Sequence, residues 1–345
     1  MPRSASGSTV SISRHTEKLH RRVVRTVDEL SPGTAELVAA TGANFNYGPE
    51  FLRGYELFPI QPVHGCYYVE LFDPDGAVAA FAPCYVQGDP LGALGLVPGE
   101  FALLSHVWHC SDTRLVARQT TAEVATEMLA AMRDVARTAG LHRMGFINVA
   151  VDSPSAQALE EIGLRGIHLD TRYWLDLARF GDEEGVLAAV KSADRREYRR
   201  HWRRGTEAGV RIVVRNALPD EDTEKLELLE TTMVRVGSPG YYDAAKLASF
   251  LAQTPSARIV EVTLDGDLLA LAIVFVDDTR MHAWALGYDR DRPLPFSPYY
   301  LTWATFVRLG YQLGVPRLEA GRRNGEFKTR YGLSAHELNG YVTDV

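Results

Sequence analysis

One order of secondary structure occurs in both halves of the chain, and it constrains the fold more than any single motif. In the first half, period-2 strands flank the turn Asp73-Pro-Asp-Gly76, a pattern typical of a β-hairpin. An amphipathic helix at 117–139, a strand at 144–149, a short helix from Ser153 and a strand at 167–177 follow. This half therefore contains a hairpin, a long helix, a strand, a short helix and a strand.

The second half repeats this order, although its residues show no similarity to those of the first half. A hairpin is predicted around Asp265-Gly-Asp267, where strands at 258–264 and 268–276 meet. The later elements are a strand at 280–286, a helix from Ser297 to Leu313, a strand at 317–320, a short helix at 326–331 and a strand at 338–342. The repeat is thus one of topology.

The alternation of strands and helices predicts an α/β fold. At about 100–200 residues per domain, 345 residues suggest two domains. We expect a flexible, Ser-rich tail at 1–18, an N-terminal domain at 19–180 and a C-terminal domain at 181–345. Each domain should contain a twisted mixed sheet flanked by helices, with the boundary near 178–183.

Positive charge is concentrated in one segment of an otherwise acidic chain. The net charge is −7, yet residues 191–215 contain nine Lys or Arg and three acids. On the helix predicted at 195–207, Arg195, Arg199 and Arg203 share a face. Such a face is either solvated and ion-paired or binds the phosphates of a donor substrate.

Cysteine usage and hydropathy favour a cytoplasmic protein. Cys66, Cys84 and Cys110 are too few and too far apart for a disulfide framework, which indicates a reducing compartment. No apolar run approaches the roughly 20 residues of a membrane span. The stretch from His106 to Cys110 holds soft ligands but no metal-binding pattern, so no metal is predicted.

Three stretches of the C-terminal half resemble the Fem-like, or GNAT-6, family of the GNAT acyltransferase superfamily. They are the basic helix from Ser192 to Arg204, the segment Ser238-Pro-Gly-Tyr-Tyr-Asp243 and the segment from Glu319 to Gly332, Glu-Ala-Gly-Arg-Arg-Asn-Gly-Glu-Phe-Lys-Thr-Arg-Tyr-Gly. The resemblance covers residues 181–345, whereas the first half is similar only in its order of elements. It implies tandem GNAT-like domains with the active site in the C-terminal one.

The resemblance also implies an activity. Fem enzymes transfer an aminoacyl group from aminoacyl-tRNA to an amine of a cell-wall peptide precursor, and relatives act on specialised metabolites. Their reacting centre contains a Phe-Lys pair, which corresponds here to Phe327 and Lys328. The Lys ammonium would stabilise the developing oxyanion, a role that the flanking Gly321 and Gly325 suit because they let backbone approach a ligand closely.

Further site residues are predicted from their types and positions. Glu319 ends a strand and is the preferred group for removing the amine proton, with Glu326, His282 and Asp289 as alternatives. No Ser-His-Asp or Cys-His arrangement is present, so direct transfer is expected. The predicted substrate-binding residues are Tyr241, Tyr242, His282, Trp284, Tyr288, Tyr299, Arg322, Asn324 and Glu326.

The donor is inferred partly by exclusion. GNAT enzymes that use coenzyme A carry a Q/R-x-x-G-x-G/A turn, and neither half contains it at that spacing. Aminoacyl-tRNA is therefore the expected donor, bound by Arg195, Arg199 and Arg203, and a coenzyme A thioester is the alternative. No further cofactor is expected. A non-catalytic protein that binds cell-wall precursors is the second alternative, which the presence of Phe327-Lys328 disfavours.

Overall fold

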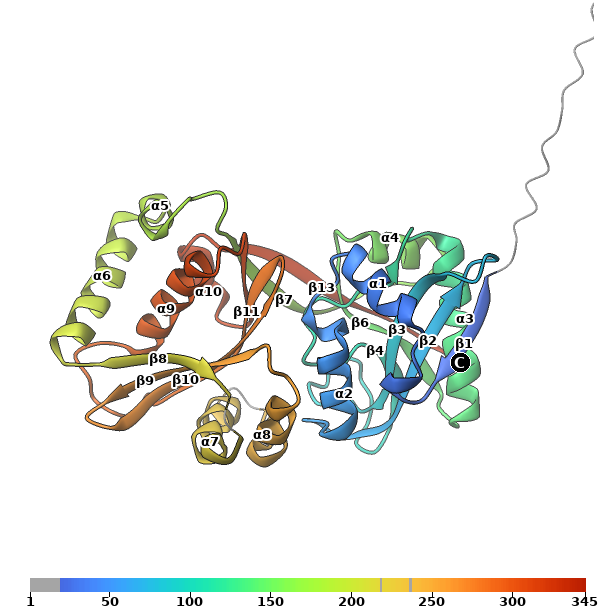
Figure 1. Ribbon diagram of the computed structural model, residues 1–345, viewed down its shortest axis with the longest axis horizontal. Coiled ribbons are helices and arrows are strands. Elements are labelled where there is room, and N and C mark those ends of the chain that lie inside the picture. The colour runs from blue at the N-terminus through green and yellow to red at the C-terminus, as the bar shows by residue number, and fades with distance from the viewer. Residues whose placement is uncertain (1–18, 218, 236–237) are drawn as a thin grey trace, which may run out of the picture.

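A computed structural model describes residues 19–217, 219–235 and 238–345. The tail predicted at 1–18 lies outside the described residues. Two lobes lie side by side, each with helices against a sheet, and the predicted α/β class is confirmed (Figure 1). No helix in the described part of the chain is long and apolar enough to cross a membrane.

The first lobe is built mainly from the N-terminal half. Its elements are β1 (His20–Val24), α1 (Pro32–Ala40), α2 (Pro49–Leu57), β2 (Val63–Phe72), β3 (Val78–Gln87), β4 (Ala102–Ser105), β5 (Val116–Ala117), α3 (Ala122–Thr138), β6 (Arg143–Ala150), α4 (Pro154–Glu161) and β7 (Ile167–Asp176). Strand β1 ends at Val24, and Thr26 and Glu29 form a capping box that begins a 3-10 helix at Val27.

The second half of the chain contains the remaining elements, which build the second lobe except for β13, the strand that returns to the first lobe. They are α5 (Glu183–Ala189), α6 (Ser192–Glu207), β8 (Arg211–Asn216), α7 (Pro219–Arg235), α8 (Ala244–Ala252), β9 (Ala257–Leu264), β10 (Asp267–Asp277), β11 (Arg280–Tyr288), α9 (Pro298–Gln312), β12 (Arg317–Arg322), α10 (Gly325–Arg330) and β13 (Ser334–Asp344). Helix α6 lies at the end of the molecule farthest from the first lobe (Figure 1).

A single 13-stranded sheet runs through both lobes of the described chain, in the order β1-β2-β3-β4-β6-β13-β7-β12-β11-β10-β9-β8 with β5 beside β3. The two halves exchange strands where they meet. Strand β7 pairs with β12 of the second half, whereas β13 pairs with β6 of the first half and with β7. The chain therefore ends in the first lobe (Figure 1). The domain limits at 180 and 181 stay a prediction, because strand pairing crosses them.

Buried apolar side chains stabilise each lobe separately and also join the two. One cluster surrounds α3 on the first lobe, and another surrounds α9 on the second. A third cluster spans the junction, where Phe51 and Tyr55 of α2 contact Phe250 of α8. Burying an apolar side chain of this size stabilises the folded state by about 1.5–3 kcal/mol. The two lobes are therefore packed firmly together at the junction, which fixes the positions of residues from both.

Candidate active site

The parallel strands β11 and β12 separate along their length, and a cavity lies where they part. Met281 pairs with Leu318 and His282 with Glu319, and the residues that follow on both strands line a cavity of about 340 Å³. Helix α9, the end of α7 and loops of the first lobe complete its walls. Ligand sites of α/β folds commonly lie beyond the carboxyl ends of parallel strands.

The matching position in the first lobe is filled by the protein itself. Strands β4 and β6 are also parallel, with Ser105 opposite Phe146. Beyond them, the side-chain amide of Asn148 donates to the carbonyls of Trp108 (3.3 Å) and Cys110 (2.8 Å), and the Trp108 side chain is buried. Chain segment 106–113 thus occupies the place that is open in the second lobe. This difference favours the C-terminal half as the site of chemistry.

An irregularity in β11 lies in the cavity wall. Ile273 of β10 pairs with Ala285, but the next residue, Val274, pairs with Ala283, which leaves Trp284 as an extra residue in β11. A bulge of this kind leaves the extra residue outside the ladder and redirects its side chain. Here the Trp284 indole lines the cavity and donates to the carbonyl of His109 (3.3 Å).

Lys328 is buried in α10 and lines the cavity. Its side chain is 5% exposed, and its ammonium donates to the carbonyls of Arg322 (2.7 Å) and Gly321 (3.2 Å). Burial lowers the pKa of Lys328 to about 7, although the nearby carboxylates of Glu319 and Asp170 oppose this shift. A buried ammonium group of this kind can stabilise negative charge that develops beside it.

Glu319 lines the same cavity from β12. It is 2% exposed, and neither carboxylate oxygen has a hydrogen-bond partner among the described residues. The guanidinium of Arg172 lies 3.8 Å from one of these oxygens. Because buried polar atoms in proteins are normally hydrogen-bonded, these two unpaired oxygens are available to a ligand N–H.

A buried ionic cluster holds Arg172 beside Glu319 and joins the two lobes. Asp112 of the first lobe contacts Arg172 of β7 (2.7 Å), Arg280 of β11 (2.9 Å) and Arg114 (2.8 Å). Burial alone would raise the pKa of Asp112, but the three arginines outweigh it and lower the pKa. Removing one partner of such a buried pair would leave an uncompensated charge.

The turn between β12 and α10 is strained. Arg323 and Asn324 are not glycines, yet their φ angles are 66° and 51°, and Gly321 precedes them at 65°. Left-handed residues of this kind cost about 1–3 kcal/mol each and cluster at functional sites. A Cβ at Gly325 would overlap the hydroxyl of Tyr173, so this glycine is required by packing.

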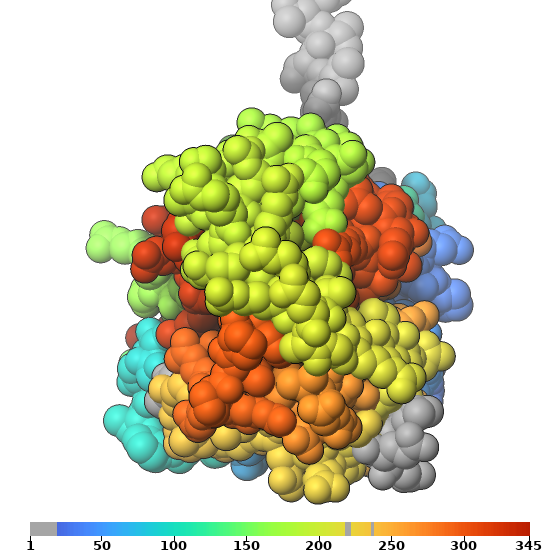
Figure 2. All heavy atoms as spheres, turned by 90° about the vertical axis from the view of Figure 1, so that its left-hand side faces the viewer, coloured from blue at the N-terminus to red at the C-terminus, as the bar shows by residue number. Residues whose placement is uncertain are grey.

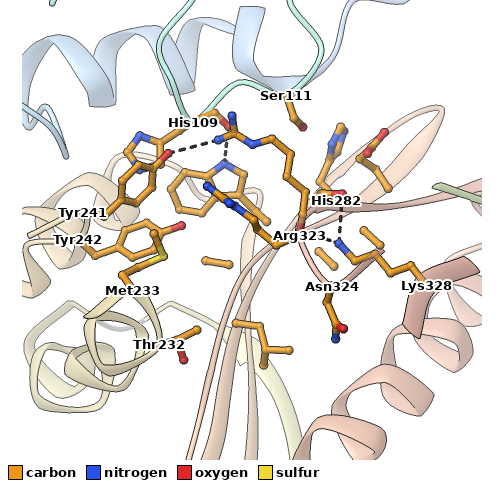
Figure 3. Close-up of a pocket in the computed structure, with 18 of the residues that line it drawn as sticks. His109, Ser111, Thr232, Met233, Tyr241, Tyr242, His282, Arg323, Asn324 and Lys328 are labelled. Atoms are coloured by element: carbon orange, nitrogen blue, oxygen red, sulfur yellow. Dashed lines mark hydrogen bonds between the residues drawn. The ribbon is translucent and has the colours of Figure 1, made fainter. Parts of the chain in front are cut away.

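Aromatic residues form the wall opposite this turn. Tyr241, Tyr242 and Met233 lie on one side of the cavity, and Asn324 and Lys328 lie on the other (Figure 3). The His109 ring lies 4.6 Å from the Tyr241 ring and 5.3 Å from the Trp284 ring. Burial lowers the pKa of His109 to about 3, so this imidazole is neutral at physiological pH.

Most of the predicted site residues meet in this cavity. Those that line it are Tyr241, Tyr242, His282, Trp284, Tyr288, Tyr299, Glu319, Arg322, Asn324 and Lys328. His282 hydrogen-bonds Asp277 at 2.9 Å. Burial would raise the pKa of Asp277, but this bond holds it at about 2.

Other predicted residues lie outside the cavity lining. Phe327 is buried against Tyr299 and Tyr300, and Glu326 is exposed. Helix α6, which carries the basic stripe, lies on the face that the second lobe presents at the end of the molecule (Figure 2). There Arg199 pairs with Glu184, and Arg203 lies 3.6 Å from Glu207.

Sequence reasoning missed the contribution of the first lobe. His109, Ser111 and Asp170 line the cavity, although they precede the predicted C-terminal domain. The polar and aromatic side chains of segment 106–110 lie at this junction between the lobes, where His109 contacts Tyr241 and Trp284. No group of three or more His, Cys, Asp or Glu among the described residues is arranged to hold a metal.

Comparisons with known proteins agree with this geometry. Residues 192–329 match the family model of the acetyltransferase (GNAT) domain. No curated protein matches the chain.

Among solved structures, FemX is similar with a TM-score of 0.66 and 12% identity over 94% of this chain and 97% of that one. A tandem GNAT protein from the clavulanic acid biosynthesis pathway has a TM-score of 0.56 and 16% identity over 95% and 98%. L-PGS from Bacillus licheniformis has a TM-score of 0.55 and 14% identity over 90% and 91%. At these identities the structural likeness is one of fold. Residues 192–329, which supply most of the cavity lining of the second lobe, thus match a GNAT acetyltransferase domain, and nearly the whole chain shares the fold of FemX and of the tandem GNAT protein.

Proposed function

We propose that the chain forms an amide bond by transferring an aminoacyl group from aminoacyl-tRNA to an amine in the cavity between β11 and β12. The observation that carries this proposal is the burial of Lys328 and Glu319 in one cavity, each 5% exposed or less. The acceptor would be an amine of a peptide, a cell-wall precursor or a specialised metabolite. A tRNA donor would place the reaction in the cytoplasm.

The two side chains divide the chemistry between them. The acceptor amine attacks the acyl carbonyl, a C–N bond forms, and Glu319 takes the proton that the amine loses. Lys328 and the adjacent backbone face the oxygen that becomes negative. The ester C–O bond then breaks, and the leaving 3′-oxygen of the tRNA takes up the proton that Glu319 accepted, so Glu319 is regenerated and no covalent enzyme intermediate is needed.

The electrostatic effect of Lys328 is large enough to matter. A unit charge about 4 Å from another, at an effective dielectric of 20, interacts by about 4 kcal/mol. Each 1.36 kcal/mol removed from the barrier is about tenfold in rate. Phe327 supports this lysine, because its ring packs against Tyr299, Tyr300 and Trp303 and anchors α10 on α9.

Features of the surface bear on the donor. On α6, Arg199 and Arg203 are exposed and Arg195 is half-buried, and this face at the end of the lobe would contact the phosphate backbone of a tRNA. The fold likeness to FemX agrees with this donor. The alternative is an acyl-coenzyme A donor, since the similar tandem GNAT protein is described as a form without AcCoA.

Nuclease treatment tests the choice of donor. We expect the purified chain to transfer a radiolabelled amino acid from a charged tRNA pool to an amine acceptor, and ribonuclease added beforehand should abolish product. A mixture with acyl-coenzyme A in place of tRNA should give none. Transfer that survives ribonuclease and needs coenzyme A thioester would replace the tRNA donor with the alternative, and absence of transfer from both would overturn the proposal.

A further inference from the structure

Three exposed arginines from three different elements stand at the mouth of the cavity. Arg235 ends α7, Arg290 follows β11, and Arg323 lies in the turn before α10. They are far apart along the chain, so no local pattern groups them. None of them belongs to the basic helix α6.

Two of these arginines flank one aromatic ring. The guanidinium carbon lies 6.0 Å from the ring centre of Tyr288 for Arg235 and 5.5 Å for Arg290. Among the described residues, neither has an ion-pair partner within 4 Å. Two cations beside one ring, neither paired with a carboxylate, make this part of the cavity mouth positive, which favours binding of an anion there.

The third arginine, Arg323, shares its carboxylate partner with another arginine. Asp170 lies 3.8 Å from Arg323 and also 3.9 Å from Arg322, so one carboxylate faces two guanidinium groups. Positive charge is thus in excess at the mouth of the cavity. The contrast with α6 is direct, since Arg199 and Arg203 each have a carboxylate partner there.

We propose that Arg235, Arg290 and Arg323 form a phosphate-binding rim for the nucleotide of the acyl donor, with the Tyr288 ring as the surface on which its base stacks. Guanidinium groups bind phosphate oxygens in pairs, and aromatic rings stack on bases of any sequence. The ring centre of Tyr299 lies 5.5 Å from that of Tyr288 and 4.8 Å from that of Phe327, the residue before Lys328, so a second aromatic ring continues this surface. The inference rests on the proposed function, because it assumes that an acyl donor enters this cavity.

Both candidate donors carry this chemistry, since an aminoacyl-tRNA and a coenzyme A thioester each contain a phosphorylated adenosine. The probes are therefore coenzyme A and the trinucleotide cytidylyl-cytidylyl-adenosine, each titrated into the full chain by calorimetry. One of them is expected to bind. Arg235→Ala and Arg290→Ala should each raise the Kd of that probe by at least about tenfold, the effect expected from loss of a hydrogen bond to a charged group.

Salt dependence provides a second readout. Each phosphate contact contributes about 0.7–0.9 to the slope of log Kd against log salt concentration, so each variant should reduce the slope by about that amount. Arg165→Ala is the matched control, because Arg165 is exposed before β7 and lies outside the cavity lining. It should leave Kd and slope unchanged.

Charge reversal on α6 separates the two basic surfaces. Arg199→Glu should weaken the binding of intact tRNA. It should leave unchanged the Kd of whichever small probe, coenzyme A or the trinucleotide, binds the wild-type chain. The rim is refuted if neither probe binds, or if Arg235→Ala and Arg290→Ala keep the wild-type Kd and slope. Because these are binding measurements, a rim that binds its probe in a chain without transfer activity would support the rim and contradict the proposed function.

Discussion

Lys328→Ala is expected to lower kcat by about 10²–10³-fold while changing KM little, because one oxyanion-stabilising donor contributes roughly 2.7–4 kcal/mol. The interaction strengthens as charge develops on the carbonyl oxygen, so its loss affects the transition state more than the bound substrate. The measurement is steady-state transfer, with kcat and KM determined separately.

Two controls accompany this variant. Lys328 also donates to the carbonyls of Gly321 and Arg322, so thermal unfolding must show that the variant is folded. Lys246→Ala removes an exposed lysine of α8 and should leave transfer unchanged. A folded Lys328→Ala protein with near wild-type kcat would remove Lys328 from the reacting centre.

Glu319→Gln is expected to lower kcat by about 10²–10⁴-fold, the range that a positioned proton acceptor contributes. The substitution keeps the shape of the side chain. It removes the proton acceptor proposed for the amine, and it also removes a charge that favours the ammonium form of Lys328. The expected signature is a large loss of kcat with a modest change in KM for the acceptor.

The matched control is Glu337→Gln, which changes an exposed carboxylate of β13 outside the cavity lining. It should transfer at the wild-type rate. If Glu319→Gln keeps kcat within about twofold, the proton leaves the amine by another route, and His282 or a solvent molecule becomes the better candidate.

Local sequence signals determined much of the fold. The turns at 73–76 and 265–267 specify hairpins because few residues satisfy such backbone angles, and both hairpins are present. The long helix predicted at 117–139 is present as α3, since its apolar face has one clear period, but it begins only at Ala122, after the N-cap Thr121, and Ala117 belongs to β5. Features of this kind depend on residues close together in sequence.

The exchange of β7 and β13 depends instead on residues far apart. Nothing local in either strand specifies whether it pairs with its own half or with the other. The same limit determines which site residues could be predicted from the sequence. Glu319 and Lys328 could be found on the C-terminal turn, whereas His109, Ser111 and Asp170 reach the cavity only through contacts between the lobes. The rim arginines of α7 and β11 likewise become visible only when these two elements are adjacent.

The pH dependence of transfer tests the role of Lys328 most directly. If the ammonium is the active form, kcat/KM should fall about tenfold per pH unit above the Lys328 pKa of about 7. Lys328→Arg, which stays charged, should be slower and lack this descending limb. A rate that instead rises through pH 7 in the wild type and loses that rise in Lys328→Arg would show that the neutral amine acts as a base, which contradicts oxyanion stabilisation by Lys328.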